Sequence, residues 1–181
     1  MEEWKVNGSS VERKFPNRTG LGFVLWTVLA LCVVLGGCQG SLFNVQGQSI
    51  QYPDRLALKT GGEQSGQYKA AEITVDYRYV RTRDDLKMSG TIRFNYSMQG
   101  NFSTVNTFSL ALVLADAQGT ILAQQGLATA YDHKVGDPIT FNTTMIIPSQ
   151  TAIMAFNYTG ASSGAGTSGS PSAFWHNPAG K

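Results

Sequence analysis

The 181-residue sequence contains little charge and very little cysteine or histidine. Lys and Arg total 14, Asp and Glu total 12, and there are 2 His, so charged residues make up 14% of the chain and the formal net charge is +2. Soluble domains average about 25% charged residues. This shortage argues against a disordered polyelectrolyte, a coiled coil, or a domain that holds nucleic acid by electrostatic attraction. It suits a neutral, β-rich protein that works outside the cytoplasm.

The scarcity of cysteine and histidine argues against disulfides, metal sites and thiol catalysis. Cys32 and Cys38 both lie near the N-terminus, so the chain beyond residue 38 has no thiol for a disulfide, a zinc site or a cysteine nucleophile. His133 and His176 are far apart and do not have the spacing of metal ligands. We therefore expect no metal and no cofactor, and a core held together by packing alone.

An apolar run lies close to the N-terminus. Residues 21–35 read LGFVLWTVLALCVVL, and Arg13, Lys14 and Arg18 precede them. A basic flank followed by an apolar run is typical of a signal peptide or signal anchor. The run of about 15 residues is short for a permanent anchor, because a helix needs about 20 apolar residues to span a bilayer. We expect residues 1–37 to be a helical signal peptide.

The run ends in a Leu-small-small-Cys sequence made of Leu35, Gly36, Gly37 and Cys38. This sequence resembles the lipobox of bacterial lipoproteins. The resemblance implies cleavage before Cys38 and a lipid on its thiol, and two or three acyl chains hold a protein on a membrane essentially permanently. In this family Gln39, where an Asp would favour the inner membrane, implies the outer membrane facing the periplasm. A transmembrane helix that ends in a free thiol at Cys38 is the alternative.

Most of the remaining chain alternates apolar and polar residues with period two, which is typical of half-buried antiparallel strands. The alternation is clearest in residues 73–79, 92–98, 108–114, 139–147 and 152–158. Asp116 to Gly119 has the composition of a type I turn that closes a hairpin. About seven strands without helices predict an all-β antiparallel sandwich over residues 67–181, resembling immunoglobulin or fibronectin type III domains.

The segment between the signal peptide and these strands is polar. Residues 38–66 are rich in Gln, Gly and Ser, which predicts a flexible tether between lipid and domain. Its middle, residues 52–58, can form a first edge strand.

Two groups of residues are candidate partner surfaces. Arg78, Arg81, Arg83 and Arg93 form the densest basic cluster, which predicts a surface that faces an anionic partner. The alternative is an ordinary sheet face on which arginine stems cover apolar surface and pair with nearby Asp residues. Phe174 and Trp175 follow the Gly- and Ser-rich stretch 160–170 and predict a second surface, because loops on a rigid sandwich often carry recognition.

No set of residues predicts catalysis. Residues 160–164 match the Gly-x-Ser-x-Gly nucleophile elbow around Ser162, but that motif needs a following helix, and the sequence predicts none. We therefore expect a non-catalytic, lipid-anchored envelope lipoprotein whose sandwich binds a protein or glycan and no nucleic acid. A single-span membrane subunit of a secretion or export apparatus is the main alternative, and a hydrolase that uses Ser162 is a third.

Overall fold

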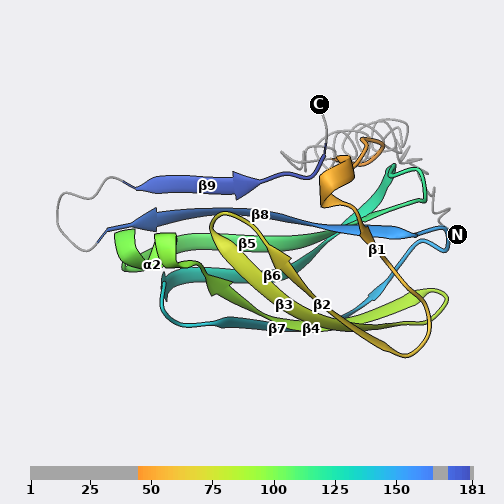
Figure 1. The fold of residues 1–181 in the computed structure, drawn as a ribbon, viewed down its shortest axis with the longest axis horizontal. Coiled ribbons are helices and arrows are strands. Elements are labelled where there is room, and N and C mark those ends of the chain that lie inside the picture. The colour runs from red at the N-terminus through yellow and green to blue at the C-terminus, as the bar shows by residue number, and fades with distance from the viewer. Residues whose placement is uncertain (1–44, 165–170, 180–181) are drawn as a thin grey trace, which may run out of the picture. The chain divides into compact units, whose positions relative to one another are not determined.

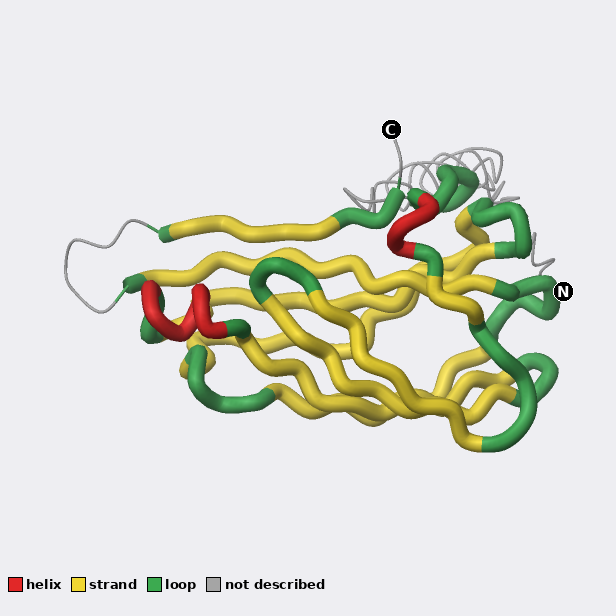
Figure 2. Tube along the Cα trace, in the orientation of Figure 1, coloured by secondary structure: helices red, strands yellow, loops and turns green. Residues whose placement is uncertain are grey.

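The structure is a computed structural model that describes residues 45–164 and 171–179. The described residues form two antiparallel sheets packed face to face, which confirms the predicted all-β sandwich (Figure 1). Helix within this part of the chain is confined to two short segments (Figure 2).

The first sheet has four strands, β2 (Glu63–Lys69), β3 (Ile73–Arg81), β4 (Asp85–Phe94) and β7 (Ile139–Ile146). They are hydrogen-bonded in the order β2-β3-β4-β7. The register pairs apolar positions, since Val75 lies opposite Ile92 and Ile92 lies opposite Ile139. These side chains face inward and the residues between them face solvent, as the period-two pattern predicted.

The second sheet has five strands, β1 (Leu56–Ala57), β5 (Thr104–Ala115), β6 (Ile121–Lys134), β8 (Ile153–Ser163) and β9 (Ser172–His176). β5 lies between β6 and β8. The other edge of β8 is shared: β1 pairs with its first two residues, and β9 pairs with residues 158–162. The hairpin between β5 and β6 turns at Asp116–Gly119, as predicted, with Gly119 at a φ of +94°.

The main core lies between the sheets. Aromatic residues contribute strongly: the ring of Phe94 lies 5.3 Å from that of Phe108 and 6.3 Å from that of Phe174. Twelve large side chains are less than 2% exposed, and they are Phe94, Phe156, Ile50, Ile73, Leu86, Met88, Ile92, Leu110, Leu112, Leu114, Ile121 and Met154. All but Ile50 and Ile121 belong to this core.

A smaller core lies on the outer side of the five-stranded sheet. Val113 and Ala115 of β5 face away from the main core and pack with Val45 and Ile50 from the N-terminal segment and with Ala179. Ile50 also forms a β-bridge with Ala179. Residues 45–66, which the sequence analysis placed in a flexible tether, thus belong to the folded unit, because burial of Val45 and Ile50 fixes them on the sheet.

The structure corrects the strand expected over residues 92–98. That strand stops at Phe94, and Tyr96–Asn101 form the short helix α2. The side chain of Asn95 caps the β2–β3 turn by donating to the carbonyl of Ala70, and Met98 turns into the core. The helix allows the chain to leave the four-stranded sheet and enter β5.

The strand order differs from that of immunoglobulin constant domains. In those domains the second and third strands belong to different sheets. Here β2, β3 and β4 form a continuous meander in one sheet. The resemblance to immunoglobulin domains therefore extends to the sandwich architecture and not to the connections.

Candidate functional site

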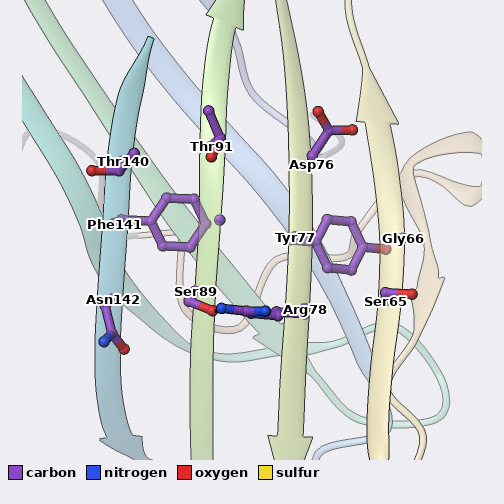
Figure 3. A pocket seen from close by; sticks show the side chains of 11 residues that line it. Ser65, Gly66, Asp76, Tyr77, Arg78, Ser89, Thr91, Thr140, Phe141 and Asn142 are labelled. Atoms are coloured by element: carbon purple, nitrogen blue, oxygen red, sulfur yellow. The ribbon is translucent and has the colours of Figure 1, made fainter.

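A groove of about 690 Å³ lies on the four-stranded sheet and runs across its strands (Figure 3). We call it the transverse groove. Three cross-strand rows build it, two polar rows with a Gly-aromatic row between them. Its lining consists of Ser65, Gly66, Asp76, Tyr77, Arg78, Ser89, Gly90, Thr91, Thr140, Phe141 and Asn142.

The middle row consists of Gly66, Tyr77, Gly90 and Phe141 in register. Tyr77 faces the core, where its ring lies 5.3 Å from that of Phe156. The two glycines make room for the rings beside them: a Cβ on Gly66 would lie 2.5 Å from the Tyr77 hydroxyl, and one on Gly90 would lie 2.6 Å from Cζ of Phe141. The row therefore depends on glycine for close packing, and it sends no side chain outward between the polar rows.

The first polar row contains Ser65, Arg78, Ser89 and Asn142, one residue from each strand. Nε of Arg78 donates a 3.0 Å hydrogen bond to Oγ of Ser89, so the arginine side chain lies across β4 (Figure 3). This bond holds the guanidinium over the sheet, and the Arg78 side chain is exposed. Arg78 continues into a second, smaller depression of about 120 Å³ that includes Glu63 and Lys87.

The second polar row contains Gln67, Asp76, Thr91 and Thr140. Nε2 of Gln67 donates to Oδ1 of Asp76 at 2.6 Å, and Nη1 of Arg93 forms an ion pair with the other carboxylate oxygen. The hydrogen bond from Gln67 and the neighbouring Arg93 guanidinium lower the pKa of the Asp76 carboxyl. Asp76 is thus ionised, and Arg93 balances its charge.

The structure separates the four arginines of the predicted basic cluster. Arg78 and Arg93 lie on the outer face of the four-stranded sheet. Arg81 faces inward, is 8% exposed, and donates from Nη1 to the carbonyl of Leu58 at 3.2 Å. Arg83 lies in the turn between β3 and β4. Arg78 and Arg81 are three residues apart in one strand, so the alternation of side chains places them on opposite faces, and this odd spacing was the sequence signal that could have indicated the separation.

Phe174 and Trp175 also point to opposite sides of their sheet. Phe174 is 7% exposed and belongs to the main core, whereas Trp175 is 70% exposed. Phe174 therefore cannot form part of a partner surface, and Trp175 alone faces solvent. Residues 165–170 of the neighbouring loop lie outside the described residues, as do Leu35, Gly36, Gly37 and Cys38.

Ser162 is not arranged as a nucleophile. It is fully buried, and its hydroxyl donates to the carbonyl of Ser172 at 3.4 Å. The ring nitrogen of His133 contacts the carbonyl of Asp137, and that of His176 contacts Oδ1 of Asp54 at 3.0 Å. Neither histidine is hydrogen-bonded to Ser162, and residues 160–163 continue as strand.

Sequence reasoning missed a cluster of polar and aromatic residues that joins the two sheets. Tyr158 of β8 donates a 2.5 Å hydrogen bond to Glu72, and its ring stacks on His176 of β9 at 5.8 Å. The ring centre of Tyr68 in β2 lies 6.2 Å from that of His176. Burial raises the pKa of Tyr158 and of Tyr68, and nearby carboxylates reinforce both shifts. The cluster joins segments that are distant in sequence, so no local pattern could have indicated it.

Other signs of function are few in the part of the chain that the structure describes. No group of three or more His, Cys, Asp or Glu residues is placed to hold a metal ion there, and no helix in that part is long and apolar enough to cross a membrane. No protein-family model, curated protein or solved structure matches the chain. The transverse groove combines a volume of about 690 Å³ with polar side chains that neighbouring side chains hold in place.

Proposed function

We propose that this chain is a non-catalytic lipoprotein of the bacterial envelope, anchored by acyl chains on Cys38, whose sandwich binds a glycan or protein partner in the transverse groove. The Leu35–Cys38 motif supports the anchor, and its position after an apolar run with a basic flank is that of a lipobox. Gln39 supports an outer-membrane location facing the periplasm.

The geometry of the groove is the observation that carries the binding role. Its polar side chains come from four hydrogen-bonded strands, and Arg78 and Asp76 are held by neighbouring side chains. Because the side chains are already ordered, a ligand pays little conformational entropy to engage them. A polar site of this kind on a rigid sheet suits recognition.

The short stretch of sequence between Cys38 and Val45 limits how far the sandwich can lie from the proposed anchor. Val45 is the first described residue and is buried in the smaller core. Val45 follows Cys38 by seven positions in the sequence, and seven steps of fully extended chain span at most about 25 Å. A lipid on Cys38 would therefore hold the sandwich near the membrane surface, where a partner in the envelope could reach the groove.

Mass spectrometry of the protein isolated from bacterial membranes tests the anchor. We expect a mature chain that begins at Cys38 and carries a diacylglyceryl group, and we expect Cys38→Ser to abolish both processing and lipid. An intact Met1–Gly37 segment on the membrane-bound protein would contradict the lipoprotein proposal. Membrane retention of full-length Cys38→Ser would instead favour a single-span subunit of an export apparatus.

A further inference from the structure

The transverse groove contains one arginine that forms no ion pair with a described residue. Arg78 and Asp76 are the charged residues of its lining. Asp76 is paired with Arg93, whereas Arg78 bonds only the neutral hydroxyl of Ser89 within the described residues. The planar guanidinium of Arg78 therefore presents free N–H groups, the geometry that binds a carboxylate through two hydrogen bonds.

The other polar groups of the groove are hydroxyls and an amide. Ser65, Ser89 and Asn142 stand in the row of Arg78, and Thr91 and Thr140 stand in the row of Asp76. These groups both donate and accept hydrogen bonds, as sugar hydroxyls do. The rows cross four strands, and three strand spacings cover about 14 Å. The groove thus offers an extended line of contacts suited to several units of a polyhydroxylated chain.

The position of the groove disfavours an extended peptide. Peptides that add to a sheet use the free backbone groups of an edge strand. The groove crosses β3 and β4, which are paired with neighbours on both sides. A nucleic acid is also a poor fit, because bases bind by stacking on aromatic side chains, and Tyr77 and Phe141 of the groove face the core. A polymer recognised through its hydroxyls and through a carboxylate fits these contacts.

We propose that the transverse groove binds an acidic polysaccharide whose sugar units carry carboxylates, with one carboxylate on Arg78 and sugar hydroxyls on the two polar rows. This assignment rests on the proposed binding function, whose partner class it names. It does not depend on the lipid at Cys38.

Binding of the purified full-length chain in detergent to polygalacturonate tests the assignment. Fully methyl-esterified polygalacturonate has the same backbone without charge, and dextran sulfate is a polyanion of different structure. We expect polygalacturonate to bind, its methyl ester to bind at least about tenfold more weakly, and Arg78→Gln to weaken polygalacturonate binding by about 10- to 100-fold. Arg83→Gln makes the same chemical change in the β3–β4 turn, outside the groove, and should leave binding unchanged.

Several outcomes would overturn the assignment. Polygalacturonate could fail to bind, its methyl ester could bind equally well, or Arg78→Gln and Arg83→Gln could weaken binding equally. Dextran sulfate could also bind as tightly as polygalacturonate, with no loss of that binding in Arg78→Gln. Unchanged thermal unfolding of Arg78→Gln shows that any loss is local. If Cys38 is lipidated but polygalacturonate does not bind, the ligand assignment fails and the anchor stands. If polygalacturonate binds but the N-terminus is not processed, the anchor fails and the ligand assignment stands.

Discussion

The hydroxyl of Tyr158 donates a 2.5 Å hydrogen bond to Oε2 of Glu72, linking the five-stranded sheet to the turn between β2 and β3 of the other sheet. The two residues are 86 positions apart in the chain. Tyr158 is only 2% exposed and belongs to the main core. The bond therefore adds a polar connection between the two sheets to the apolar packing of that core.

Tyr158→Phe should remove this bond and leave a Glu72 oxygen without its partner. Hydrogen bonds to charged groups contribute about 1.5–3 kcal/mol. We expect the free energy of unfolding, measured by urea denaturation at pH 7, to fall by that amount. Tyr131→Phe is the matched control, because Tyr131 is 73% exposed, and it should change stability by less than about 0.5 kcal/mol. Equal effects of the two substitutions would contradict a stabilising role for the bond.

The stability of the domain should fall at alkaline pH. Burial and Glu72 raise the pKa of Tyr158 above the ordinary value of about 10, and burial and nearby carboxylates raise that of Tyr68. Below about pH 10 both the folded and the unfolded chain keep these protons, so the contribution of the two tyrosines to the free energy of unfolding does not change with pH. Above it the unfolded chain loses protons that the folded chain retains, so the free energy of unfolding decreases. Denaturation curves from pH 8 to beyond pH 11 should show a shallower decline for Tyr158→Phe than for the unchanged protein; parallel declines would refute this origin.

Gly160→Ala should strain the main core. A Cβ at this position would lie 2.3 Å from Cζ of Phe174, whose ring packs among Phe94, Phe108 and Tyr158. Overpacking of this kind typically costs about 1–3 kcal/mol. Gly126→Ala is the control in strand β6 of the same sheet, since a Cβ there meets nothing within 4 Å. Chemical denaturation should separate the two variants, and equal stability would show that the Phe174 ring moves freely.

Two adjacent aromatic residues should respond very differently to truncation. Phe174→Ala opens a cavity in the main core and should lower the free energy of unfolding by about 3–5 kcal/mol. Trp175→Ala removes a side chain that is 70% exposed and should change it by less than about 0.5 kcal/mol. Similar losses in a thermal or urea unfolding series would contradict the assignment of Phe174 to the core and Trp175 to the surface.

Asp116 should stabilise the β5–β6 hairpin through its side chain. Oδ1 of Asp116 accepts hydrogen bonds from the backbone N–H groups of Gln118 and Thr120 at 3.0 and 2.8 Å. Asp116→Ala leaves both donors without this partner and should destabilise the domain by about 1–2 kcal/mol. Asp116→Asn keeps an acceptor oxygen and should recover most of the loss. If Asn is as destabilising as Ala, the side-chain bonds are not the cause.

The sequence predicted the elements whose signals are local. Alternating residues such as Ile73, Val75 and Ile92 predicted half-buried strands, and Asp116 with Gly119 predicted the hairpin turn, because side-chain direction and turn geometry depend on a few neighbouring residues. The sandwich architecture followed from the number of such strands. The short helix α2 was missed because the same alternation continued through Tyr96 and Met98.

Only the tertiary structure decided which residues meet. Strand order follows from packing the whole chain, and it brings Ser65, Arg78, Ser89 and Asn142 into one row across four strands. The Leu35–Cys38 motif, by contrast, was determined by the sequence alone, because these residues lie outside the described part of the structure. A motif of this kind is recognised in consecutive residues, whereas the transverse groove is made by residues that come together only when the sheet forms.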